Sequence, residues 1–242
     1  MSFYIYLTTA QTIVLAADNR KQVWTVRAGL EGSPRMEGLT SWNARKIHAV
    51  GFGWWMTGTG LSPFLAKVRN HARNLLEEKA REDRSSLEVT KILTVESGSL
   101  QRLFEETVFE LTQKMRGGVE KPEMLENLQE IVFAGFDEAA KPVVLRARSV
   151  ETFSFEVQTG AGILGFTGEM GVWQETVIQA IHGFLADVLR DLLSRPATEV
   201  GHRAWNLVPS LFQRMARSFP EKLSACGDLV LIVPSGHQWF LF

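Results

Sequence analysis

The residues that could do chemistry stand near the start of the chain. Ser2 follows the initiator methionine, and Asp18 is a lone acid at the end of the second of two strand-like runs. A serine hydroxyl is a weak nucleophile unless a base lies beside it. Once Met1 is removed, the α-amine of Ser2 is such a base, because a pKa of about 8 leaves a fair fraction neutral. We therefore expect Ser2 to become the first residue and to form an active site.

The elements that must hold these residues alternate between groups of strands and pairs of helices. The run 28–43 is rich in Gly, Ser and Pro and predicts a loop. Ser62 as N-cap and Pro63 at the first helical position mark the start of a strong helix. The predicted strands are 3–9, 12–17, 46–50, 53–59, 130–136, 142–148, 152–158, 228–234 and 237–242, and the predicted helices are 62–82, 98–116, 172–194 and roughly 199–218.

This order predicts sheets that pack together with helices outside them. No internal repeat, low-complexity tract or linker divides the chain, so we expect a single domain over residues 1–242.

Composition narrows the class of protein. Lys plus Arg is 26 and Asp plus Glu is 27, and this balance gives no support to nucleic acid or an anionic membrane as a partner. One cysteine excludes an intrachain disulfide and a Cys-rich metal site, and the five histidines show no ligand spacing. No apolar run reaches the length of a membrane helix, and the start lacks the features of a signal peptide. We expect a cytoplasmic protein with no metal and no cofactor.

Five short segments follow one another in an order typical of a known family. They are TIVLAADNR at 12–20, NARKIHAV at 43–50, WMTGTG at 55–60, IVFAGFDEAAKPVVLRARS at 131–149 and TGAGI at 159–163. Together they resemble the β-type subunits of proteasomes, and the layout is most similar to bacterial proteasome homologues of the Anbu type. The resemblance implies an α+β fold, a four-layer αββα sandwich in which two antiparallel sheets lie between helix pairs.

The resemblance also implies an N-terminal-nucleophile hydrolase that cleaves peptides with Ser2. The spacings from Ser2 to Asp18 and from Lys46 to Gly60 match those of the family without a gap. Lys46 would place an ammonium beside the nucleophile, and Asp18 would hold Lys46. The backbone N–H of Gly60 would stabilise the oxyanion, a contact typically worth about 3–4 kcal/mol.

The same alignment implies a pocket and a supporting set of residues. The pocket beside the nucleophile would be lined by Ala44, His48, Gly58 and Ser62. Ala161 stands where the family has a serine that supports the N-terminal amine. In PEKLSACGD at 220–228, Ser224 or Cys226 takes the place of a later family serine, and Glu221 is the nearest upstream acid.

Two functions from different classes remain open on these grounds. The first is a peptidase that acts on peptides or proteins within a ring or helical assembly of identical subunits, with an ATPase unfoldase as a candidate partner. The second is an inactive scaffold or regulatory ring subunit, which Ala161 and the altered segment 220–228 favour. Ser2, Asp18 and Lys46 each have a plain structural explanation as well, as a common second residue, a strand end and a solvated strand edge.

Overall fold

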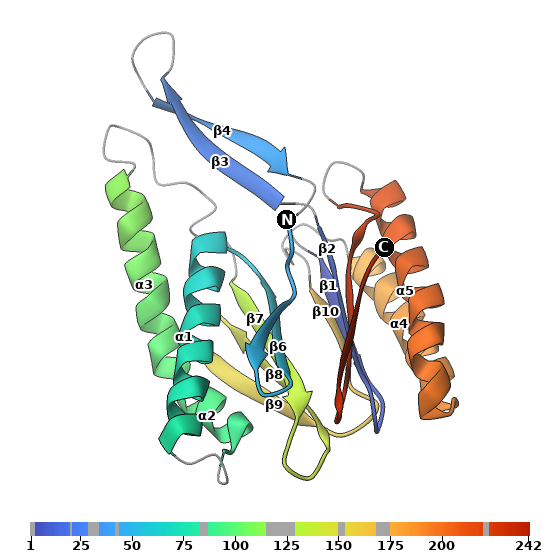
Figure 1. Cartoon of the computed structure of the whole chain (residues 1–242). Coiled ribbons are helices and arrows are strands. Elements are labelled where there is room, and N and C mark those ends of the chain that lie inside the picture. Colours follow the sequence, from blue (N-terminus) through green and yellow to red (C-terminus); the bar gives the residue numbers. More distant parts are fainter. Residues whose placement is uncertain are drawn as a thin grey trace.

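The computed structural model describes residues 3–19, 21–28, 34–41, 44–82, 87–114, 129–149, 153–167, 175–219 and 223–242. Two five-stranded antiparallel sheets form its centre (Figure 1). The first sheet has the order β10 (Leu164–Thr167), β1 (Tyr4–Thr8), β2 (Ile13–Asp18), β11 (Gly227–Val233) and β12 (Gly236–Leu241). The second has the order β5 (His48–Gly51), β6 (Trp54–Thr59), β7 (Glu130–Phe136), β8 (Pro142–Arg148) and β9 (Ser154–Thr159).

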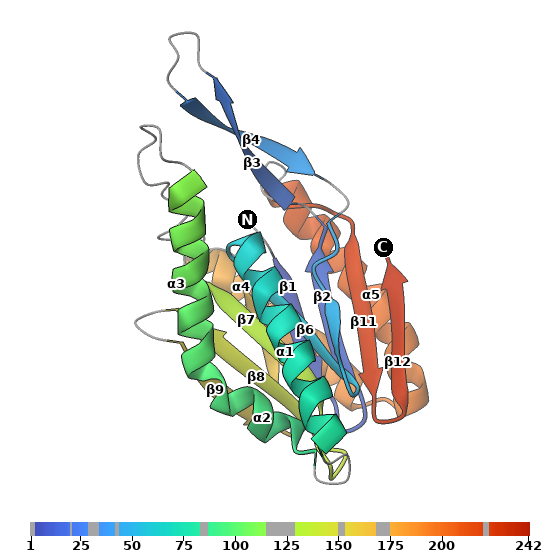
Figure 2. The same cartoon turned by 60° about the vertical axis from the view of Figure 1, so that its left-hand side comes forward.

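The helices of the described residues divide between the two sheets, as Figures 1 and 2 show. One group packs on the second sheet and the other on the first. The first group is α1 (Ser62–Glu82), α2 (Val89–Val95) and α3 (Ser97–Lys114), and the second is α4 (Glu175–Leu193) and α5 (Ala197–Ser218).

Three apolar clusters account for this arrangement. Ile5 and Leu229 of the first sheet pack with α4 and α5, whereas Phe133 of the second sheet packs with α1 to α3. A third cluster fills the space between the sheets and contains Leu15 and Trp55. Successive strand residues point to opposite faces, so apolar runs such as IVLAA in β2 serve two clusters at once. The packing is compatible with a sandwich of sheets and helices.

Helix α1 illustrates how the sequence fixes an element. Phe64, Val68, Ala72 and Leu76 are its buried residues, and their spacing of four forms one apolar stripe that faces the core. The helix begins at Ser62 and ends at Glu82, so the prediction for this element is confirmed. None of the helices in the described ranges combines the length and the apolar character needed to cross a membrane.

The prediction of a loop over 28–43 is wrong for Pro34–Ser41, which form strand β4. It pairs with β3 (Lys21–Ala28) in a two-stranded ribbon that extends away from both sheets (Figure 1). Glycine and proline suggested a loop, but Pro34 is the first residue of the strand, where its missing N–H is tolerated. The short helix α2 and strand β10 were also missed, because both are too short to carry a clear period.

Candidate active site

Asp18 lies at the end of β2, fully buried, and receives two hydrogen bonds on one carboxylate oxygen. Its Oδ1 accepts from the Nζ of Lys46 at 2.6 Å and from the backbone N–H of Phe3 at 2.8 Å. The backbone N–H of Asp18 in turn donates to the carbonyl of Phe3 at 3.0 Å. The antiparallel register of β1 and β2 sets Tyr4 opposite Ala17, which brings Phe3 beside Asp18. The pairing of β1 with β2 therefore places Asp18 beside the start of β1.

Lys46 precedes β5 of the second sheet, and two carboxylates of the first sheet hold it. Its side chain is 10% exposed and pairs with Asp18, while its backbone N–H donates to Oδ2 of Asp228 at 3.2 Å. An ion pair withdrawn from water interacts more strongly than an exposed one. Lys46 is therefore fixed at both its backbone and its ammonium group where the ends of the two sheets meet.

Asp228 is the second residue of β11 and is 2% exposed. Burial raises the pKa of its carboxyl, and the N–H of Lys46 and the charge of Arg45 act in the opposite direction. The guanidinium carbon of Arg45 lies 4.1 Å from the centre of the Trp239 ring, and its charge acts on Asp228 from the residue before Lys46. Asp228 therefore holds the backbone of the chain at Lys46.

Ser2 lies outside the described residues. The nitrogen of Phe3, which donates to Asp18, is the atom through which Ser2 is joined to the rest of the chain. Asp18 and Lys46 therefore lie together at the described start of the chain. The role of Ser2 as nucleophile stays a prediction.

Gly60 follows β6 with a φ of 122°, a conformation that L side chains rarely adopt. A Cβ at this position would also collide with the side-chain amide of Gln129, whose Oε1 accepts from the N–H of Leu61 at 2.7 Å. Strands β5 and β6 are antiparallel with His48 opposite Met56. The residues after Met56 therefore run toward the end of the sheet that carries Lys46, and Gly60 lies at that end.

Replacing Gly60 with alanine is expected to lower the free energy of unfolding by about 1–3 kcal/mol, the cost of holding a side chain in this backbone conformation. Gly98 on α3 offers a matched control, because a Cβ there meets nothing within 4 Å and its φ is not positive. Urea unfolding should show no loss for Gly98→Ala. Equal stability of the two variants would contradict the constraint at Gly60.

The predicted pocket residues lie on three segments around this end of the second sheet. Ala44 is half-buried, and its N–H donates to the carbonyl of Asn19 at 3.0 Å. Gly58 is buried in β6, where a Cβ would meet the backbone oxygen of Glu130 and, at 3.1 Å, the side chain of Leu65. Ser62 is the first residue of α1. Gly58 thus allows close packing of β6 against β7 and α1.

His48, the fourth predicted pocket residue, is half-buried beside arginines. Its Nδ1 lies 3.3 Å from a guanidinium nitrogen of Arg69 on α1. Burial, and then the charges of Arg69 and Arg45, lower the pKa of His48 to about 4. The imidazole is therefore neutral at neutral pH, and its Nδ1 can accept a hydrogen bond from Arg69.

Stability should depend on pH through His48. Unfolded His48 takes up a proton below its ordinary pKa of 6.5, whereas folded His48 does so only near pH 4. Between these values the unfolded chain binds more protons, so His48 destabilises the fold progressively as pH falls from 6.5 to 4. We expect a loss of about 1–2 kcal/mol, less than the full shift implies because partial exposure screens the charge.

Urea unfolding of the wild type and of His48→Gln at pH 7.5 and at pH 4.2 measures this effect. The other titrating groups are common to both proteins, so only the difference in their pH dependence counts. Parallel loss of stability in the two proteins would show that His48 does not carry the effect.

The structure brings two of the three predicted supporting residues to the site. Ser224 is buried and its Oγ accepts from the N–H of Cys226 at 3.0 Å. The carbonyl of Cys226 accepts from the N–H of Asn19 at 3.1 Å, directly beside Asp18. The exposed Cys226 and the buried Ser224 therefore lie on a segment attached to the end of β2.

Ala161 is not brought to Asp18. The residue after it, Gly162, donates its N–H to the carbonyl of Thr8 at 2.9 Å, at the opposite end of β1 from Phe3. Five residues of strand separate those ends by about 17 Å. Strand β10 carries the chain back, and its last residue, Thr167, pairs with Tyr4. The resemblance to the family turn placed Ala161 beside the N-terminal amine, whereas the turn between β9 and β10 holds it next to Thr8.

Two residues of the site were missed from the sequence. Asp228 was treated only as part of a strand, although a lone acid beside a buried apolar run is the same signal that marks Asp18. Arg69 was treated as part of a helix, and nothing in its spacing indicates that it faces His48. No group of three or more His, Cys, Asp or Glu side chains that could hold a metal ion occurs in the described ranges.

Comparison of the whole chain with protein-family models and with curated proteins found no match.

Proposed function

We propose that the chain is an N-terminal-nucleophile amide hydrolase of the proteasome type, with Ser2 as the nucleophile. The observation that carries the proposal is the buried carboxylate of Asp18, which binds both the Lys46 ammonium and the amide nitrogen that links Phe3 to Ser2. A cation held this close to the start of the chain would stabilise the alkoxide that forms when the Ser2 amine takes the proton of the Ser2 hydroxyl.

The chemistry follows from these groups. After Met1 is removed, the Ser2 amine takes the proton of the Ser2 hydroxyl, whose oxygen attacks the carbonyl carbon of the substrate amide. The C–N bond breaks, the amine leaving group takes that proton, and an ester joins the acyl part of the substrate to Ser2. Water then hydrolyses the ester with the same amine as the base. The Lys46 ammonium favours the alkoxide, and the Gly60 N–H binds the oxyanion.

The finer fold proposal is a four-layer αββα sandwich. The three separate apolar clusters support it, since two lie between a sheet and its helices and one lies between the sheets. With this fold we propose the assembly of identical subunits into a ring or helix that encloses peptide or protein substrates.

Ser2→Ala tests the function. Wild-type protein whose intact mass shows loss of Met1 should gain the mass of one β-lactone probe, and Ser2→Ala should gain none and should release no coumarin from peptidyl coumarin amides. Light scattering of both proteins reports the assembly independently of activity. Processed wild type that neither binds the probe nor cleaves peptides would overturn the hydrolase and favour an inactive scaffold.

A further inference from the structure

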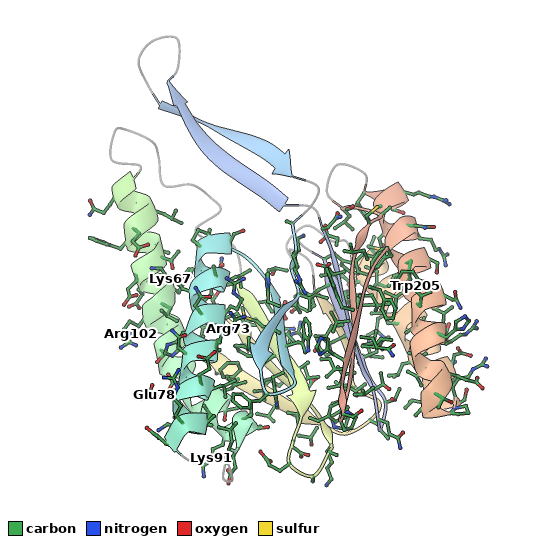
Figure 3. The ribbon with its side chains drawn as sticks, in the orientation of Figure 1. Lys67, Arg73, Glu78, Lys91, Arg102 and Trp205 are labelled. Atoms are coloured by element: carbon green, nitrogen blue, oxygen red, sulfur yellow. The ribbon has the colours of Figure 1, made fainter. Side chains whose placement is uncertain are left out.

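Positive charge gathers beside His48. Arg69 and Arg73 lie on α1 next to β5, and Figure 3 labels Arg73 on that helix. A guanidinium nitrogen of Arg69 is 3.3 Å from Nδ1 of His48, and Arg73 donates to the carbonyl of Ala49 at 3.0 Å. Both contacts use neutral acceptors. The remaining bonds of Arg69 go to the side-chain oxygen of Asn70 at 3.3 Å, which is also neutral.

Neither Arg69 nor Arg73 forms an ion pair with another described residue. The two carboxylates of the candidate site, Asp18 and Asp228, are both bound by Lys46. Elsewhere on the helices carboxylates pair with arginines, namely Arg81, Arg102, Arg190, Arg195 and Arg203. The formal net charge of the whole chain is −1, so the excess of positive charge beside His48 is local.

This cationic cluster adjoins the candidate site. The Cα atoms of Lys46 and His48 are two residues apart and can be separated by at most about 7 Å. A substrate whose reacting carbonyl lies near Lys46 would therefore place a neighbouring side chain within reach of His48 and α1.

We propose that His48, Arg69 and Arg73 form a subsite for an acidic side chain of the peptide substrate, next to the bond that is cleaved. The proposal rests on the proposed function, because it names the substrate of that site. The planar guanidinium fork binds carboxylates with two parallel hydrogen bonds, which gives both energy and orientation. Asn70 is a weak competitor at 3.3 Å, and a substrate carboxylate would replace it as the acceptor.

The test uses binding first, because binding needs no turnover. Two fluorescein-labelled tripeptide amides that end in Glu or in Gln are titrated into Ser2→Ala protein and followed by fluorescence anisotropy. We expect the Glu peptide to bind about 10-fold tighter than its neutral isostere at low salt, with the ratio falling as salt rises. Arg69→Gln in the same background should reduce the ratio below about 3-fold, and Arg73→Gln should have a smaller effect.

Lys67→Gln is the matched control. Lys67 lies on the same helix but pairs with Glu110, so its loss should leave the ratio unchanged. Equal affinity for the two peptides, or a ratio that survives Arg69→Gln, would overturn the acidic subsite. A separate measurement tests the hydrolase. In it, wild-type protein is assayed for cleavage of coumarin amides that end in Glu or in Gln. Selective binding of the Glu peptide without cleavage would support the subsite and reject the hydrolase. Cleavage without a preference for Glu would support the hydrolase and reject the subsite.

Discussion

Replacing Lys46 with methionine should lower the rate of amide hydrolysis by about 10²–10³-fold, the scale expected for loss of a fixed charge that stabilises the developing alkoxide. It should also lower the free energy of unfolding by about 3–5 kcal/mol, because Asp18 is fully buried and would lose its cation. Coumarin release and urea unfolding at pH 7.5 measure the two effects. Lys67→Met is the control, because its partner Glu110 is largely exposed and such pairs contribute at most about 1 kcal/mol.

A double variant separates stability from catalysis at this pair. Asp18→Asn with Lys46→Met removes both charges, and an Asn side-chain oxygen can still accept from the N–H of Phe3. We expect most of the stability to return while hydrolysis stays low. Recovery of hydrolysis along with stability would mean that Lys46 acts only by supporting the fold.

Glu130→Gln is expected to cost about 3–5 kcal/mol of unfolding free energy, since it breaks a second buried ionic group. Glu130 is fully buried on the face of β7 toward the other sheet, and its Oε1 accepts from Nε of Arg146 and, at 3.1 Å, from Nε of Arg148. Arg146 is only 12% exposed and would be left without its carboxylate. Burial raises the pKa of the neighbouring Tyr4, and the charge of Glu130 raises it further.

Glu199→Gln provides the comparison, because Glu199 is exposed and its bond to Arg195 is 3.5 Å long. Its loss should cost less than about 1 kcal/mol in the same urea experiment. Adding Arg146→Met to Glu130→Gln should recover part of the loss, because the unpaired charge is then gone. A loss below about 1 kcal/mol for Glu130→Gln alone would mean that water solvates Arg146.

The sequence predicted those helices and strands whose own residues show a clear hydrophobic pattern. Helix α1 was placed from its apolar stripe and its first residues, and strands such as β7 were placed from short apolar runs. The ribbon of β3 and β4 was not predicted. Gly and Pro in 28–43 suggested a loop where β4 lies, and the prediction did not include β3. The two strands hydrogen-bond with each other in a separate sheet, so their pairing depends on contacts that neither strand shows alone. Strand β10 was missed because it is too short to carry a clear period, and Ala161 was assigned by resemblance to a family turn and not from any contact along the chain.

By itself the sequence determined the strands and helices with a clear period and marked Asp18 and Lys46 as candidates through their resemblance to a known family. Only the tertiary structure decided that Asp18 and Lys46 meet at 2.6 Å, that Asp228 holds Lys46 from 182 positions away, and that Arg69 faces His48. The reason is physical. Periodicity is a property of neighbouring residues, whereas these contacts depend on how two sheets and a helix pack against one another.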